Sequence, residues 1–232
     1  MTPSNAASPS KTSRRSGIRT APAKKPRIRL TPEERIEQIV TVSTSLVAQN
    51  GFYGLSLQSV ADGVGITQAG LLHYIGNKEG LLELLLDKRY DRQGTPSDYI
   101  ATGAPSAVHP DGVSLPGYFR FLVDFNARRP QLMQLYMVLG TEAADKNHPA
   151  HAYFRNRPDD VWNFYQETTW RLPPSIVEAG GFATLRPLIE MALEAIDGAQ
   201  VRIWRFPAVD LRDEWARFDE LLFPSPLWDG YR

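Results

Sequence analysis

The chain contains no cysteine, which excludes disulfide bonds, thiolate catalysis and cysteine-ligated zinc. It also has no uninterrupted apolar run approaching the roughly 18 residues that a membrane span requires, so we expect a soluble protein. A nucleophile elbow, a phosphate-binding loop and a dinucleotide-binding glycine motif are all missing. We therefore predict a protein that is not an enzyme, needs no cofactor and resides in the cytoplasm.

Acidic residues are missing from the first 32 positions, which carry eight lysines and arginines. The whole chain has 26 basic and 26 acidic residues, so the remainder holds 18 basic against 26 acidic ones. The segment is rich in Ser, Pro, Ala and Thr and poor in large apolar residues, which predicts a disordered basic arm over residues 1–30. The charge favours a polyanionic partner, although a solubilising leader and an organellar transit peptide remain alternatives.

Helical patterning begins at Thr31, an N-cap residue followed by Pro32 and two glutamates in the first turn. The spacing of the apolar residues predicts a helix that runs to about Gln49 and is stopped by Asn50-Gly51. Ser56 is placed to cap a second helix that starts at Leu57.

The stretch VADGVGITQAGLLHYIGNKEGL, residues 60–81, has the spacing of a helix-turn-helix. Ala61 is the small residue that lets two steeply crossing helices touch, and Gly65 allows positive φ in the turn. We expect the shared core to include Val60, Val64, Ile66, Leu71 and Tyr74. Thr67 caps the second of these helices, and Asn77 caps a further helix that begins at Lys78.

Residues 33–92 resemble the DNA-binding domain of the TetR family of bacterial transcriptional regulators. The resemblance rests on nine positions of the family signature: Ala61, Gly65, Ile66, Thr67, Leu71, Tyr74, Asn77, Lys78 and Leu81. It implies a homodimeric, nucleoid-associated regulator that places residues 68–75 of each subunit in the major groove of double-stranded operator DNA. Gly70 departs from the pattern, since glycine lowers helix propensity by about 1 kcal/mol relative to alanine.

Chemistry and resemblance together assign roles on this helix. Gln68 can pair with adenine and His73 with a base or a phosphate, while Ala69 and Leu72 can meet thymine methyl groups and Gly70 allows close approach. Thr67, Tyr74 and Lys78 are expected to contact phosphates. Residues 33–93 carry five basic against eight acidic side chains, so the arm, including Arg27 and Arg29, is expected to supply charge, through the minor groove in one interpretation.

Residues 94–117 are rich in Pro and Gly and are predicted to be a linker, either mobile or acting as a lid. Helical patterns follow at 118–128, 131–144, 150–171, 183–204 and 211–222. The fold class is therefore all-α: a three-helix helix-turn-helix domain at 31–93 and a helical effector-binding and dimerisation domain at 118–232. The resemblance implies that helices 183–204 and 211–222 form the dimer.

Residues 131–171 are dense in methionine and aromatic side chains, which suit a small-molecule cavity, although plain core is the alternative for each residue. The candidate effector-pocket residues are Phe125, Met133, Tyr136, Met137, Trp162, Tyr165 and Gln166. His148 and His151 have a metal-ligand spacing but lack a clear third ligand, so we predict no metal site. The implied function is a repressor released from a near-palindromic operator by a small molecule; a ligand-independent architectural or regulatory DNA-binding dimer is the alternative.

Overall fold

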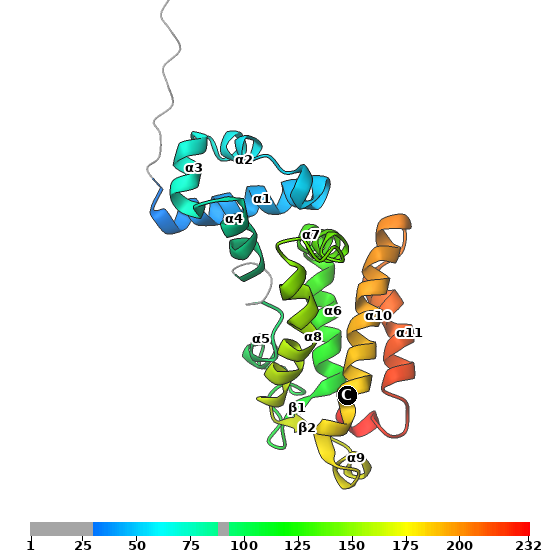
Figure 1. Ribbon diagram of the computed structural model, residues 1–232. Coiled ribbons are helices and arrows are strands. Elements are labelled where there is room, and N and C mark those ends of the chain that lie inside the picture. Colours follow the sequence, from blue (N-terminus) through cyan, green and yellow to red (C-terminus); the bar gives the residue numbers. More distant parts are fainter. Residues whose placement is uncertain (1–29, 88–92) are drawn as a thin grey trace, which may run out of the picture.

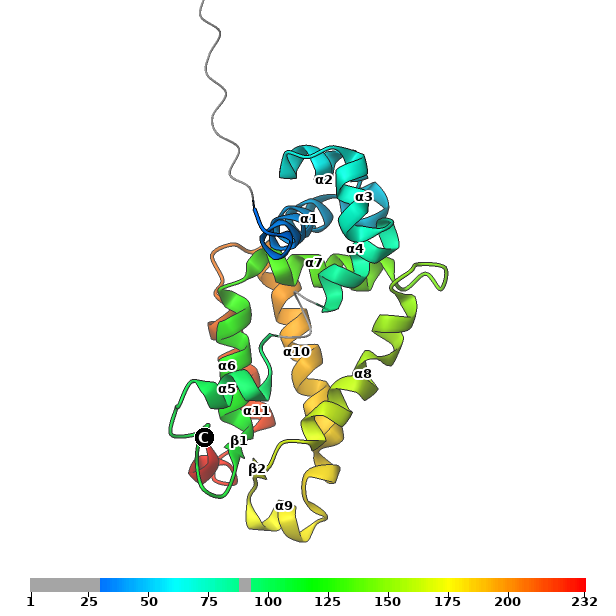
Figure 2. The ribbon, with the colours of Figure 1, turned by 90° about the vertical axis from the view of Figure 1, so that its left-hand side faces the viewer.

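The computed structural model describes residues 30–87 and 93–232, and its helices form two groups (Figure 1). The upper group consists of α1 (Pro32–Gly54), α2 (Leu57–Val64), α3 (Gln68–Ile75) and α4 (Lys78–Leu84). Beneath α1 lies α7 (Pro130–Glu142), from which the lower group extends away: α6 (Leu115–Ala127), α8 (His151–Gln166), α10 (Arg186–Arg205) and α11 (Leu211–Leu222) (Figure 2). The predicted all-α fold class is confirmed. No helix in the described ranges has both the length and the apolar character to cross a membrane.

The start of α1 is fixed by a capping box. The Thr31 hydroxyl accepts a hydrogen bond from the backbone N–H of Glu34 at 3.2 Å, and the Glu34 carboxylate accepts one from the Thr31 N–H at 2.8 Å. The predicted stop is also present, because Gly51 has φ +72° and ψ 173°, outside the helical region. Phe52 to Gly54 add one more turn beyond this kink, and Phe52 is buried while Tyr53 is 58% exposed.

The turn between α2 and α3 follows the sequence prediction. Gly65 adopts φ +75° and ψ 34°, the left-handed conformation that glycine tolerates best. Val60, Ala61, Val64 and Leu71 are buried in one core, and Ile66 and Tyr74 pack against it half-buried. The predicted caps are confirmed as well: the side chains of Ser56, Thr67 and Asn77 each accept a backbone hydrogen bond three residues later.

The segment predicted as a linker, residues 94–117, has structure of its own. Thr95 caps α5 (Pro96–Ala101), with Pro96 in the first turn, and Tyr99 and Ala107 are buried. β1 (Val113–Ser114) then pairs in parallel with β2 (Trp170–Arg171) from the far side of α8. The prolines and glycines that suggested a linker occupy helix starts and turns, and the segment packs against the lower group.

α11 has the predicted bounds, and the other helices of the lower group start or end a few residues from the predicted positions. α6 begins at Leu115 because the Ser114 hydroxyl accepts a hydrogen bond from the Gly117 N–H at 2.9 Å. The pattern predicted over 150–171 is α8 followed by β2, and α8 contains Pro158 in its interior. α9 (Pro174–Glu178) and the short 3-10 helix η2 (Gly181–Leu185) precede α10, and neither is predicted from the sequence.

The buried residues form two hydrophobic cores that meet at α7. Leu132, Met133, Leu135 and Leu139 of α7 belong to the core of α1 to α4, whereas α6, α10 and α11 build the other core. α7 is therefore part of the upper core although it follows α6 in the chain.

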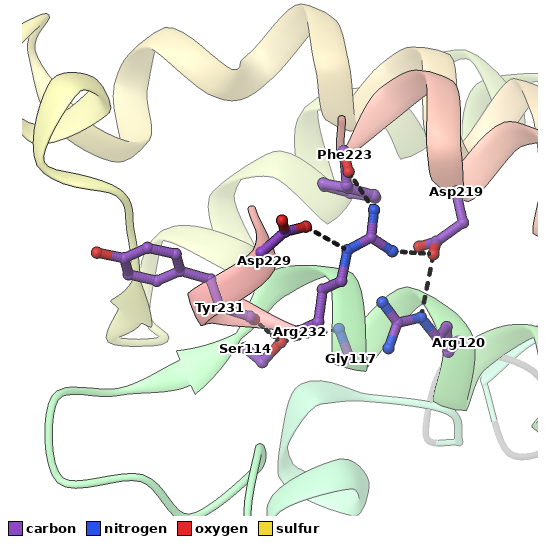
Figure 3. A network of polar contacts seen from close by, with 8 residues as sticks. All are labelled: Ser114, Gly117, Arg120, Asp219, Phe223, Asp229, Tyr231 and Arg232. Carbon is purple, nitrogen blue, oxygen red and sulfur yellow. Dashed lines mark hydrogen bonds and ion pairs between the residues drawn. The ribbon is translucent and has the colours of Figure 1, made fainter. Parts of the chain in front are cut away.

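A network of polar contacts holds the last residues against the lower core (Figure 3). Asp219 of α11 accepts hydrogen bonds from Arg120 at 3.2 Å and from Arg232 at 2.7 Å. Arg232 also donates to the Phe223 carbonyl, and the Ser114 hydroxyl donates to the carbonyl of Tyr231, which lies in η3 (Asp229–Tyr231). Phe223 and Trp228 are fully buried beside this network, so the proline-rich end is an integral part of the fold.

Candidate DNA-binding surface and effector cavity

The N-terminal end of α3 presents its side chains to solvent. Thr67, Gln68, Ala69 and His73 are exposed, while Leu71 on the opposite face is completely buried. The Gln68 side chain makes no hydrogen bond within the described part of the chain, so its amide is available to a base edge. The structure therefore places these predicted contact residues on one solvent-facing surface.

Three other predicted contact residues are less exposed. Leu72 and Tyr74 are half-buried and pack against the upper core, and the Tyr74 ring meets the His73 ring edge-on at 5.6 Å. Lys78 is directed to the end of α1, where its ammonium lies 4.7 Å from the centre of the Phe52 ring and donates to the Tyr53 carbonyl at 3.4 Å. Lys78 must leave these contacts, or extend beyond them, to reach a phosphate.

Gly70 lies close to the residue that caps α3. A Cβ at this position would lie 3.2 Å from Thr67 Oγ1, the atom that caps α3 by accepting from the Gly70 N–H at 3.1 Å. Glu34 and Ser59 donate to the caps of their helices from the equivalent position although each has a Cβ, so the cap does not require a glycine, and the structure does not explain the departure.

Charge on the upper group is unfavourable for DNA. Within residues 33–87, Arg35 and Lys78 face seven acidic side chains, and Arg35 is bonded to Gln38 at 2.6 Å. The predicted contact residues Arg27 and Arg29 lie outside the described residues. Additional positive charge is needed for strong phosphate binding, and the first 32 residues have it in their sequence.

A cavity of about 450 Å³ lies in the lower group, against α6, α7, α8 and α10. Five of the predicted pocket residues line it: Phe125, Met133, Tyr136, Trp162 and Tyr165. Met137 and Gln166 are not among its lining residues. Gln166 is exposed and donates to Asn163 at 3.4 Å, because it follows Tyr165 by one position and so points away from the cavity.

The cavity also has residues that the sequence interpretation missed: Tyr118, which contacts the predicted Tyr165, Arg157 and three carboxylates of α10. Tyr118 and Tyr165 share a hydrogen bond of 2.9 Å between their hydroxyl groups, and burial raises the pKa of Tyr165 to about 12. Arg157 donates to the Tyr153 hydroxyl at 2.7 Å. Glu190, Glu194 and Asp197 line the α10 side. Their spacing of four and three residues is a sequence signal that could have identified one helix face.

A junction joins the end of α1 to the end of α7. The Glu142 carboxylate accepts a hydrogen bond from the Phe52 N–H at 2.7 Å, and a Cβ at Gly51 would lie only 2.3 Å from Glu142 Oε1. The buried His148 ring meets the rings of Phe52 and Tyr53 edge-on at 5.3 and 5.1 Å. Burial lowers the pKa of His148 below its ordinary value, against the opposing influence of Glu142 and Asp145.

The two histidines considered as metal ligands make separate contacts here. His148 Nδ1 accepts from the Ala150 N–H at 3.1 Å, and His151 Nδ1 lies 2.8 Å from the Ala143 carbonyl. Within residues 30–87 and 93–232, no group of three or more acidic or histidine side chains is arranged to hold a metal ion.

An exposed recognition helix, capped at Thr67 and set against α2 by the Gly65 turn, defines a helix-turn-helix DNA-binding protein. Residues 39–85 match the sequence model of the bacterial regulatory proteins of the tetR family. The matched segment therefore has the sequence and the fold of a tetR-type helix-turn-helix DNA-binding domain.

Solved structures share the fold over most of the chain. A protein from Rhodococcus sp. assigned to the TetR family is 16% identical with a TM-score of 0.54, covering 82% of this chain and 97% of its own. The fatty acid degradation regulator FadR from Bacillus halodurans is 18% identical with a TM-score of 0.54, covering 88% and 98%. A protein from Mesorhizobium loti assigned to the same family is 12% identical with a TM-score of 0.50, covering 84% and 98%. Because all three proteins are less than 25% identical to this chain, the comparison shows a shared fold and not a shared ligand or operator. No match was found among curated proteins.

Proposed function

We propose that the protein is a cytoplasmic repressor that binds a near-palindromic operator as a homodimer and is released when a small molecule occupies the cavity. The observation that carries this proposal is the double role of α7. Leu132 and Met133 belong to the buried core of the DNA-binding group and also line the cavity. A ligand in the cavity therefore touches side chains on which α1 rests.

Release follows from the geometry of a dimer on DNA. Two α3 helices must sit in successive major grooves about 34 to 36 Å apart. A shift of α7 displaces α1 and the helices that pack on it, which changes this separation. A ligand that binds the DNA-incompetent arrangement more tightly shifts the population toward it, and couplings of about 1 to 3 kcal/mol are typical.

The proposed dimer uses α10 and α11, as the resemblance implies. Met191 on α10 is 50% exposed and Leu221 on α11 is 77% exposed, both large apolar side chains. Nothing within the described chain lies within 4 Å of the position that a Cβ on Gly198 would occupy, so a second subunit can approach α10 closely at this position. These features support a helix-to-helix interface between two subunits.

The test measures binding of the full-length protein to labelled DNA fragments from upstream of its own gene by fluorescence anisotropy. Gln68→Ala is expected to weaken binding to the preferred fragment about tenfold or more, since a bidentate base contact contributes about 1 to 3 kcal/mol. Gln166→Ala makes the same chemical change on the exposed side of α8 and is expected to have no effect. Equal affinities of the two variants would contradict the assignment of α3.

Effector release is tested separately by screening small molecules for an increase in melting temperature. A repressor of the proposed kind loses DNA affinity with at least one stabilising compound. An architectural DNA-binding dimer keeps its DNA affinity with every compound that binds, and this result would overturn the effector part of the proposal.

A further inference from the structure

One face of α10 brings carboxylates to the cavity. Glu190, Glu194 and Asp197 are spaced by four and three residues, so they lie on the same side of the helix, and all three line the cavity together with Asp160 of α8. Arg157 is the positively charged residue among the described residues that line it. Four carboxylates therefore face one guanidinium in a mostly aromatic and aliphatic enclosure.

Glu190 and Arg157 have side-chain partners, and Asp197 has none within the described residues. Glu190 is paired with Arg186 at 2.8 Å, and Arg157 bonds to the Tyr153 hydroxyl while its guanidinium lies 5.4 Å from the centres of the Tyr136 and Tyr153 rings. Asp197 forms no hydrogen bond and no ion pair through its side chain within residues 30–87 and 93–232. Burial raises its pKa to about 6, with Arg157 lowering it and Glu194 raising it further, so the carboxylate is still mainly ionised near pH 7.5.

Aromatic rings form most of the wall around these carboxylates. The cavity is lined by eight of them: Tyr118, Phe125, Tyr136, Tyr153, Phe154, Trp162, Phe164 and Tyr165. The faces of such rings attract cations, and aromatic enclosures are known to recognise ammonium groups. Anionic head groups are repelled both by ring faces and by the excess of carboxylates.

We propose that the effector of this regulator is a lipophilic organic cation, whose apolar body fills the aromatic cavity and whose positive charge lies beside Asp197 and Glu194. This inference rests on the proposed function. The cavity itself is the binding site, and its carboxylates determine the class of ligand. Asp197 is half-buried and Glu194 is exposed at the cavity, so burial costs the Asp197 carboxylate part of its hydration, and a bound cation supplies the missing partner.

The test uses three probes with the same ten-carbon body: decyltrimethylammonium, decanoate and decanol. Binding to the full-length protein is measured by calorimetry and by quenching of tryptophan fluorescence, since Trp162 lines the cavity. The cation is expected to bind at least tenfold more tightly than the anion. Asp197→Asn is expected to weaken binding of the cation about tenfold and to change binding of decanol less than twofold.

Matched controls separate charge from packing. Glu167→Gln removes an exposed carboxylate that does not line the cavity and is expected to leave all three affinities unchanged. Asp197→Glu restores the charge and is expected to recover part of the affinity for the cation. Tighter binding of decanoate than of decyltrimethylammonium, or equal loss of cation and decanol affinity in Asp197→Asn, would overturn the inference.

The two proposals fail in different ways. If decanoate binds and releases DNA, the repressor function stands and the cationic class is wrong. If the protein binds no DNA in any condition, the proposed function is wrong whatever the probes show.

Discussion

Replacing Asp197 by asparagine is expected to make the protein more stable at neutral pH, although it removes a group that we assign to ligand binding. Burial raises the pKa of this carboxyl from 3.8 to about 6, so the folded state favours its protonated form. Between about pH 4 and 6 the folded protein therefore holds more protons at this site than the unfolded protein does. The contribution of Asp197 to stability falls as the pH rises through this window and stays at its low value above it.

The size of the effect follows from the shift. About two pKa units at about 1.4 kcal/mol each give a ceiling of about 3 kcal/mol at pH 7.5. Asp197 keeps some contact with the open cavity, where water reduces the penalty, so we expect Asp197→Asn to gain about 1 to 2 kcal/mol. Near pH 4 the gain should vanish, because the wild-type carboxyl is then already protonated when folded.

Urea denaturation at a fixed protein concentration, from pH 4.5 to 7.5, measures this difference directly. Glu167→Gln is the control for loss of an exposed carboxylate. Arg157 and Glu194 also act on Asp197, and both remain unchanged in the comparison. A stability difference between Asp197→Asn and wild type that is constant over the whole pH range would refute the reasoning, because it would show that packing and not ionisation is responsible.

Three further predictions concern the arm and the junction. Residues 1–29 carry eight basic and no acidic side chains, so their deletion should weaken DNA binding at moderate salt. The slope of log K against log salt concentration should become shallower by up to about 7. An unchanged slope would exclude contact of the arm with phosphates. Gly51→Ala should reduce stability more than Gly103→Ala in urea denaturation, because its Cβ would lie 2.3 Å from Glu142 Oε1 and push the carboxylate away from the Phe52 N–H. Gly103 has a similar φ of +69° and open space around it, so Gly103→Ala should lose only about 1 kcal/mol, and equal losses would argue against the junction. The folded state disfavours the charged His148 imidazole, so wild-type stability is lost as the pH falls below the ordinary histidine pKa of 6.5. His148→Phe should therefore show a smaller decline in melting temperature below pH 6.5. The same decline in the variant as in the wild type would point to other groups.

The parts of the fold that could be predicted are those that neighbouring residues determine. Thr31, Ser56, Thr67 and Asn77 each cap a helix within three residues of themselves, and Gly65 determines its own turn. Such interactions need no knowledge of distant segments, so the sequence is sufficient to place them.

The parts that could not be predicted depend on contacts between distant segments. β1 exists because residues 113–114 meet residues 170–171, and the Pro and Gly content of residues 94–117 says nothing about that pairing. Tyr136 lines the cavity and Met137 does not, a difference of one position that is decided by how α7 rotates against α1.

The proposed regulation through α7 depends on the location of the cavity, which is lined by residues of α7 that also pack in the core of α1 to α4. Closely packed cores do not deform gradually, so a ligand that moves Leu132 or Met133 must either displace the side chains of α1 that pack against them or move α1 as a whole. The hydrogen bond from the Phe52 N–H to Glu142 ties the end of α1 to the end of α7, and the missing side chain of Gly51 leaves room for the Glu142 carboxylate. Because this contact is short and partly buried, sliding between the two helices is costly, and in the proposed mechanism a shift of α7 is therefore passed on to the helix-turn-helix.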